Sequence, residues 1–164
     1  MGSDSAPAIR LAETGDLDGV LAVQEENQPE NGGTLSARFS REWFAAAVES
    51  GWLIVATVDG RVAGYVAFTP PEAQAHVPIV QAMLRAYPDP GAYLHGPICV
   101  ARDSRRRGIA VAMFRAQRER MQNAPVMAFI RADNASSRNA HVGMGMREVA
   151  EFERDGTRYV VVAA

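Results

Sequence analysis

Residues 100–110 read Val-Ala-Arg-Asp-Ser-Arg-Arg-Arg-Gly-Ile-Ala. An apolar stretch ends at three consecutive arginines and a glycine, and a helical pattern of apolar residues begins directly afterwards. The first N–H groups of a helix have no partner inside the helix and carry a partial positive charge, so they bind anions such as phosphate. The stretch therefore predicts a strand, a turn and a helix that together bind a phosphorylated ligand.

The spacing within this stretch suggests which ligand is bound. Arg105-x-x-Gly108-x-Ala110 is similar to the Gln/Arg-x-x-Gly-x-Gly/Ala signature of the GNAT superfamily of N-acetyltransferases, in which the turn holds the pyrophosphate of acetyl-CoA. The alternative is an ordinary arginine-rich helix start on the protein surface.

A second motif strengthens the resemblance. Downstream the chain reads Asn134-x-x-Ser137-x-x-x-His141-x-x-x-Gly145-Met146. This resembles the GNAT pattern Asn-x-x-Ala/Ser-x-x-x-Tyr-x-x-x-Gly-Phe, with histidine in place of the tyrosine and methionine in place of the phenylalanine. Two signatures in the family order are much less expected by chance than one.

The resemblance extends over nearly the whole chain and implies the GNAT fold. This is an α/β fold, α+β in some schemes, with a central, mixed, mostly antiparallel twisted sheet of roughly six or seven strands and about four or five helices. The sequence pattern predicts strands at residues 8–12, 52–58, 61–68, 93–101, 126–132, 146–152 and 158–162. It predicts helices after a cap at Thr14 or Asp16, between Ser40 and Gly51, within the insert 72–90, at 108–122 and after Asn134. Asp59-Gly60 and Asp155-Gly156 are typical of type I′ hairpin turns.

Length and composition predict one domain over residues 1–164, which the resemblance makes a GNAT domain, and we expect residues 1–7 to be disordered. The 164 residues are 48% hydrophobic, enough for a sizeable core, and no apolar run approaches the ~20 residues of a membrane span. The start of the chain lacks the features of a secretory signal, and Cys99 is the only cysteine, which excludes an intramolecular disulfide. We expect a cytoplasmic protein that does not associate with membranes.

Charge is distributed unevenly. Residues 1–100 contain 5 arginines and 12 acidic residues, a net charge of −7, whereas residues 101–164 contain 12 arginines and 7 acidic residues, a net charge of +5. A basic C-terminal part suits a ligand with several phosphates. All 17 basic residues are arginine, which excludes a Walker-type phosphate loop and a lysine Schiff base. The overall charge of −2 and the lack of an aromatic-rich strand beside the arginines disfavour nucleic-acid binding.

The resemblance implies acetyl-CoA as the acyl donor, and no metal. The main chain of residues 98–100 would pair with the pantetheine arm, the amides of residues 106–110 would hold the pyrophosphate, and Asn134 would bind the arm or the adjoining backbone. Glycine matters at position 108 because a Cβ there would block the approach of the phosphates. The complete set of expected cofactor-binding residues is Ile98, Cys99, Val100, Arg105, Arg106, Arg107, Gly108, Ile109, Ala110, Asn134, Ser137 and His141.

The resemblance further implies transfer by direct attack of a primary amine on the thioester in a ternary complex. His141 occupies the position of the family's tyrosine, which protonates the departing thiolate, and imidazole can donate a proton near neutral pH. Alternatively, His141 only packs beside the cofactor and solvent supplies the proton.

The general base is harder to assign. His95 is a candidate, but the family position corresponds to Leu94 or Gly96, and strict strand alternation would turn His95 to the opposite face. A bulge at Gly96-Pro97 would restore it. The other candidate carboxylates, Glu25, Glu26 and Glu30, are expected in a helix and loop of a kind that usually faces water.

Other functions remain open. Cys99 as a nucleophile is disfavoured by its apolar surroundings, and the three histidines lack metal-ligand spacing with it. A non-catalytic acyl-CoA sensor is the main alternative, because the cofactor motifs are clearer than the catalytic groups. The acceptor, a small-molecule or peptide amine, would be selected by residues 24–44. Residues 158–162, if they form an edge strand, offer a surface for a homodimer.

Overall fold

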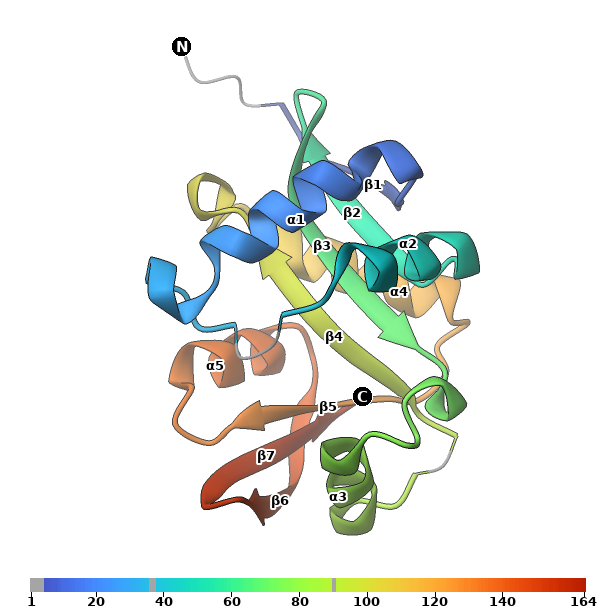
Figure 1. Ribbon diagram of the computed structural model, residues 1–164, viewed down its shortest axis with the longest axis vertical. Coiled ribbons are helices and arrows are strands. Elements are labelled where there is room, and N and C mark those ends of the chain that lie inside the picture. The colour runs from blue at the N-terminus through green and yellow to red at the C-terminus, as the bar shows by residue number, and fades with distance from the viewer. Residues whose placement is uncertain (1–4, 36–37, 90) are drawn as a thin grey trace. The chain divides into compact units, whose positions relative to one another are not determined.

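The computed structural model describes residues 5–35, 38–89 and 91–164 (Figure 1). These residues form a mixed sheet with the strand order β1-β2-β3-β4-β5-β7-β6, together with five α-helices. The strands are β1 (Ala8–Leu11), β2 (Leu53–Val58), β3 (Arg61–Thr69), β4 (Tyr93–Val100), β5 (Val126–Arg131), β6 (Arg147–Arg154) and β7 (Thr157–Ala163). The helices are α1 (Leu17–Glu26), α2 (Arg41–Ser50), α3 (Pro78–Ala86), α4 (Ile109–Arg120) and α5 (Ala135–Gly143). The predicted fold class is therefore confirmed.

Strand pairing follows the predicted mixture of directions. β4 and β5 are parallel, with Tyr93 opposite Val126 and Leu94 opposite Met127. The pairs β1–β2, β2–β3, β5–β7 and β6–β7 are antiparallel. The parallel pair is connected through α4, the crossover that a strand-helix-strand unit requires.

Residue contacts divide the chain into two compact units, which we describe separately. The first unit comprises Met1–Phe68 and Pro97–Met121, and the second comprises Thr69–Gly96 and Gln122–Ala164. A single domain over residues 1–164 stays a prediction.

In the first unit, helices cover both faces of the strands (Figure 1). Tyr65 of β3 packs against Phe44 of α2, with ring centroids 5.4 Å apart. A Cβ on the neighbouring Gly64 would instead lie 3.1 Å from the terminal methyl carbon of Met113 in α4. Because successive strand residues point to opposite faces, α2 and α4 lie on opposite sides of β3. The core on the α1 and α2 side comprises Leu17, Val20, Val23, Phe44, Ala47, Leu53, Val55, Tyr65, Ala67, Cys99 and Ala101.

In the second unit, α3 covers one face of the strands. This helix forms within the insert 72–90, where the apolar spacing predicted it. Its buried residues Val80 and Met83 pack with apolar residues of β4, β5 and β7, namely Leu94, Met127, Val161 and Ala163. The insert is therefore part of the core of this unit.

Local signals for turns and caps are mostly confirmed. Asp59 and Gly60 both have positive φ, as do Asp155 and Gly156, as type I′ turns require. The Ser40 hydroxyl caps α2 by accepting the Trp43 N–H at 3.1 Å.

One structural prediction holds only in part, and another was wrong. Asp16 is the N-cap residue of α1, as predicted, but its side chain makes no capping bond to that helix. It accepts the N–H of Glu13 at 2.7 Å and two bonds from Arg10, because a guanidinium offers a stronger, charge-assisted partner. Residues 158–162 are not an edge strand either, since they lie in β7, which pairs with β5 on one side and β6 on the other. The edges of the sheet are β1 and β6.

Arginine is the cation in the ion pairs seen within the described ranges. In the second unit, for example, the Arg138 guanidinium meets both oxygens of Glu148 at 2.8–3.2 Å. This carboxylate raises the pKa of Arg138. Most of these pairs are exposed, so each contributes little to stability.

The predicted disorder of residues 1–7 falls partly outside the described residues, which begin at Ser5. Ser5 itself donates a hydrogen bond from its hydroxyl to Asp59 at 2.8 Å. Among the described residues, no helix is both long and apolar enough to cross a membrane.

Candidate active site

The turn before α4 has the geometry of an anion site. We call residues 102–108 the phosphate turn. Arg106 and Gly108 both have positive φ, 65° and 72°, and α4 begins at Ile109. Left-handed residues alternating with right-handed or extended ones turn successive N–H groups toward the same side, which makes an anion-binding concavity. No side chain of the described residues caps α4, so its first N–H groups are available to a ligand.

The backbone conformation at position 108 gives a reason for glycine that does not depend on a ligand. A Cβ at Gly108 would meet no protein atom within 4 Å, so the chain itself leaves space there. The left-handed backbone is what favours glycine. Whether a Cβ would also obstruct phosphates stays a prediction.

Three of the four arginine side chains of the phosphate turn form hydrogen bonds within the protein. Arg105 donates to the side-chain oxygen of Asn27 at 2.6 Å, and Arg107 donates to the carbonyl of Ser5 at 2.9 Å. Arg102 donates to the carbonyls of Glu26 and Asn31 at 3.0 and 2.5 Å. These three guanidinium groups are therefore engaged with protein, which leaves the main-chain amides of the turn as candidate donors for an anion.

A polar pocket of about 570 Å³ lies beside the turn in the first unit. Its walls come from α1, the β2–β3 hairpin and the phosphate turn, and its charged lining residues are Asp16, Glu26, Asp59, Arg61, Asp103 and Arg107. This volume is within the range of small-molecule sites.

The strand leading to the turn carries the predicted pantetheine-binding residues. Ile98 and Val100 are half-buried, and Cys99 is buried. Burial raises the pKa of the Cys99 thiol to about 11. The thiol is therefore protonated at neutral pH, which argues against Cys99 as a nucleophile.

In the second unit, α5 carries the other predicted motif. The Asn134 side chain accepts the N–H of Ser137 at 3.1 Å and so caps α5. His141 is 6% exposed and lies in the last turn of this helix. Its ring lies edge to face with that of His95, with centroids 5.2 Å apart. The two histidines named as catalytic candidates are thus in contact.

Hydrogen bonding fixes the tautomer of His141. Its Nδ1 lies 2.7 Å from the Ser137 carbonyl oxygen, which can only accept, so Nδ1 carries the hydrogen. In the neutral ring the lone pair is then on Nε2. Burial lowers the pKa of His141, although the bond to Ser137 partly opposes this. At neutral pH, His141 is accordingly a neutral proton acceptor at Nε2.

β4 is continuous over Tyr93–Val100 but contains an irregular residue beside His95. Gly96 has φ of 113°, which an extended strand does not adopt. His95 is buried, and its ring packs against that of His141. A bulge at Gly96-Pro97 and the role of His95 as base stay predictions.

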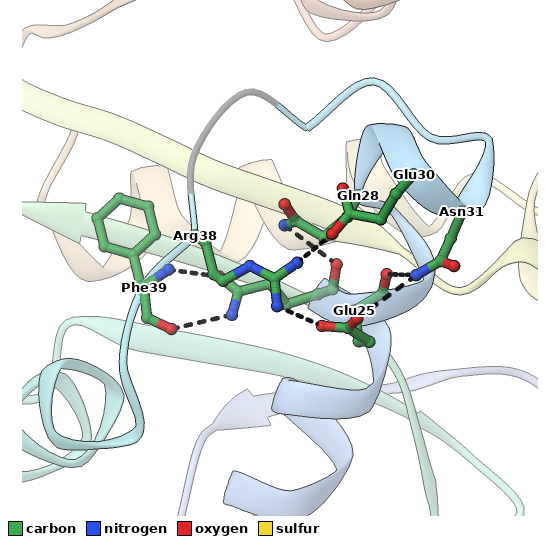
Figure 2. Close-up of polar contacts among 7 residues, drawn as sticks. Glu25, Gln28, Glu30, Asn31, Arg38 and Phe39 are labelled. Atoms are coloured by element: carbon green, nitrogen blue, oxygen red, sulfur yellow. Dashed lines mark hydrogen bonds and ion pairs between the residues drawn. The ribbon is translucent and has the colours of Figure 1, made fainter.

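The three carboxylates considered as alternative bases all have partners. The guanidinium of Arg38 binds both Glu25 and Glu30 (Figure 2). Glu26 accepts the N–H of Arg102 at 2.6 Å. Each of these carboxylates is therefore part of a protein contact.

Several residues at this site have no sequence signal. The Gln24 side-chain amide both donates to the Phe39 carbonyl and accepts the Phe39 N–H, each at 2.9 Å. Asn27 bonds to Arg105, a residue 78 positions away. Such long-range partners leave no periodic or motif pattern. In the part of the chain that the structure describes, no group of three or more potential metal ligands is found.

Comparisons with known proteins agree with this geometry. The family model "Acetyltransferase (GNAT) family" matches residues 20–146. A GNAT acetyltransferase from Streptococcus agalactiae is similar in structure, with a TM-score of 0.74, 17% identity and coverage of 96% of this chain and 94% of the other. The structure of yncA from Salmonella typhimurium with its cofactor acetyl-CoA has a TM-score of 0.69, 15% identity and coverage of 98% and 94%.

A third similar structure is the ribosomal-protein-S18-alanine N-acetyltransferase from Escherichia coli. It has a TM-score of 0.66, 15% identity and coverage of 96% and 92%. At these identities the similarity establishes the fold. A comparison with curated protein sequences found no match.

Proposed function

Because the chain belongs to the GNAT acetyltransferase family, we propose that it transfers the acetyl group of acetyl-CoA to a primary amine by direct attack in a ternary complex. The observation that carries the proposal is the phosphate turn, where two left-handed residues precede an uncapped helix start. Backbone N–H groups in that arrangement fit a diphosphate.

Different parts of the chain bind different parts of acetyl-CoA. The amides of residues 106–110 bind the diphosphate, and the main chain of Ile98, Cys99 and Val100 pairs with the pantetheine arm. Asn134, through the cap that it forms with Ser137, fixes the start of α5 and the position of His141 along that helix. Acetyl-CoA, when bound, supplies the activated acetyl group.

His141 serves as the proton carrier. Its Nε2 accepts a proton as the amine nitrogen forms its bond to the acetyl carbon, and it returns that proton to the sulfur as the carbon–sulfur bond breaks. The Ser137 carbonyl supports this use, because it holds the Nδ1 hydrogen and leaves Nε2 to exchange protons. The resulting imidazolium lies at a helix C-terminus, which favours positive charge.

His95 is the candidate for a second proton acceptor. Its ring packs against that of His141 and is equally buried. A base here would take a proton from an ammonium acceptor before attack, since only the neutral amine is a nucleophile.

The acceptor is a small-molecule or peptide amine, chosen by residues 24–44. The test is a library of primary amines offered with acetyl-CoA or longer acyl-CoAs, with free thiol and acetylated product both measured. Stoichiometric CoA and acetylated amine would support the proposal. A non-catalytic sensor would bind acetyl-CoA and release no thiol with any amine.

A further inference from the structure

We propose that Asn27 is a positioning residue that couples the phosphate turn to the loop that follows α1, of which the structure describes residues 28–35 and 38–39, so that a ligand in the turn also fixes residues 28–35. The inference rests on the proposed function, in which the turn binds CoA and residues 24–44 select the amine. All the contacts that carry it lie within the first unit.

The side chain of Asn27 forms a hydrogen bond with the phosphate turn. Its Oδ1 accepts from the Arg105 guanidinium at 2.6 Å, and its Nδ2 donates to the carbonyls of Val23 and Val100 at 2.8 and 3.3 Å. Asn27 is 8% exposed. This buried amide therefore connects the end of α1 to Val100, which precedes the phosphate turn, and to Arg105 within the turn.

The main chain of Asn27 forms a hydrogen bond with the loop. Its carbonyl oxygen accepts the N–H of Leu35 at 3.0 Å. A Cβ added to Gly33 would lie only 1.9 Å from the same oxygen, so the loop backbone packs directly on Asn27. One residue thus contacts the turn through its side chain and the loop through its main chain.

Arg102 makes a parallel connection. Its N–H donates to the Glu26 carboxylate at 2.6 Å, and its guanidinium donates to the carbonyls of Glu26 and Asn31. Asn31 belongs to the loop, and its side chain in turn donates to the Glu25 carbonyl at 2.8 Å (Figure 2). The turn is therefore connected to the loop at two points.

The far end of the loop is fixed to α1 independently of the turn. Gln24 holds the Phe39 main chain, and Arg38 holds Glu25 and Glu30 (Figure 2). The near end, residues 28–35, is held to α1 through Glu30 and Asn31, and it is connected to the phosphate turn through Asn27 and Arg102. A ligand that orders residues 102–108 orders this end through them, and by linkage an ordered loop strengthens ligand binding at the turn.

Hydrogen–deuterium exchange of the full chain with and without CoA tests the coupling without requiring a known acceptor. In the wild type, CoA should slow exchange in residues 106–110 and, by at least about five-fold, in residues 28–35. In Asn27→Ala, CoA should still protect residues 106–110 and should no longer protect residues 28–35. Glu30→Gln is the matched control, because it alters the same loop without touching the turn, and it should keep both effects.

A kinetic readout separates positioning from general instability. With an amine identified in the library, Asn27→Ala should raise KM for the amine more than KM for acetyl-CoA. Asn27→Asp keeps an acceptor for Arg105 and should recover part of the loop protection. It also serves as the test variant if Asn27→Ala does not fold.

The outcomes distinguish the two proposals. Failure of CoA to bind the wild type overturns the proposed function and this inference with it. Protection of the turn without protection of the loop overturns the inference alone. The inference is equally overturned if the Asn27 variants retain loop protection, or if they lose protection of the turn to the same extent as that of the loop.

Discussion

The imidazole rings of His95 and His141 pack edge to face, with centroids 5.2 Å apart and an interplanar angle of 85°. Both side chains are buried, so two positive charges at this separation would repel one another with little screening by water. The pair therefore favours states with at most one additional proton.

Replacing His141 with glutamine should lower kcat by about 10²-fold or more, with little change in acetyl-CoA affinity, because an amide cannot carry a proton between amine and sulfur. The pKa of His141 is lowered from 6.5, so the wild-type rate should fall only as pH drops below that value, when Nε2 becomes protonated. Steady-state kinetics across pH and a direct acetyl-CoA titration measure these quantities. An unchanged rate and pH profile in His141→Gln would remove this residue from the mechanism.

The same histidine should make stability depend on pH. Its folded-state pKa lies below the ordinary 6.5, so between these values the unfolded chain binds more protons than the folded protein. The stabilising effect is complete above pH 6.5 and is lost as pH falls toward the folded-state pKa, with a limiting slope of about 1.4 kcal/mol per pH unit. Denaturant unfolding between pH 5 and 8 should show a shallower dependence in His141→Gln than in the wild type. Equal slopes would contradict the lowered pKa.

Gly108→Ala should weaken acetyl-CoA binding by at least about 10-fold, since it adds a Cβ to the phosphate turn and strains its left-handed backbone. The matched control is Gly156→Ala in the β6–β7 turn, where φ is 79° rather than 72° and a Cβ also meets no protein atom within 4 Å. Calorimetric titration of both variants separates backbone strain from the loss of the site. Equal affinities in the two variants would argue that the turn does not bind the cofactor.

Asp16→Ala should destabilise the protein by about 1–2 kcal/mol, because it removes the acceptor for the Glu13 N–H and for Arg10. Asp18→Asn is the control, since that carboxylate is 89% exposed and its pairing with Arg41 should contribute less than about 1 kcal/mol.

The Arg10–Asp16 pair should also make the stability of the protein fall in acid. Arg10 lowers the pKa of Asp16 below its ordinary 3.8, so its stabilisation is present above that value and is lost as pH falls through the folded-state pKa. Urea unfolding at pH 7 and under acid conditions measures both effects. Equal loss of stability in Asp16→Ala and Asp18→Asn would contradict the assignment.

Cys99 should react slowly with thiol reagents in the native protein and rapidly after denaturation, because burial raises its pKa to about 11. Cys99→Ala should keep most of kcat, as direct transfer needs no acyl-enzyme. The variant is expected to lose about 1 kcal/mol of stability from the smaller side chain. An inactive but folded Cys99→Ala that still binds acetyl-CoA would instead support a nucleophilic cysteine.

Much of the fold follows from local sequence. The Asp59-Gly60 turn and the Ser40 cap depend on the backbone preferences of a few neighbouring residues, and the structure confirms both. The insert helix α3 was predicted for the same reason, from apolar residues spaced at the helical period.

The parts that could not be predicted depend on distant partners. His95 packs against His141, a distant residue that the pattern of its own strand does not reveal. In the sequence, Gln24 and Asn27 are ordinary polar residues in and just after a helix. Their contacts with Phe39 and Arg105 form only when the fold brings these residues beside them. The bond of the Asp16 side chain to Arg10 was missed because this guanidinium lies on β1, in another element.

Arginine is the cation in the ion pairs described above, and this matters for a protein that works beside a reactive thioester. Lysine side chains in such an environment can be acylated without an enzyme, which removes their charge and any contact that depends on it. A guanidinium remains protonated at all ordinary pH values and is not a nucleophile. Without a lysine anywhere in the sequence, the contacts of Arg10, Arg102, Arg105 and Arg138 are protected from acylation by the protein's own acyl donor, however concentrated that donor becomes.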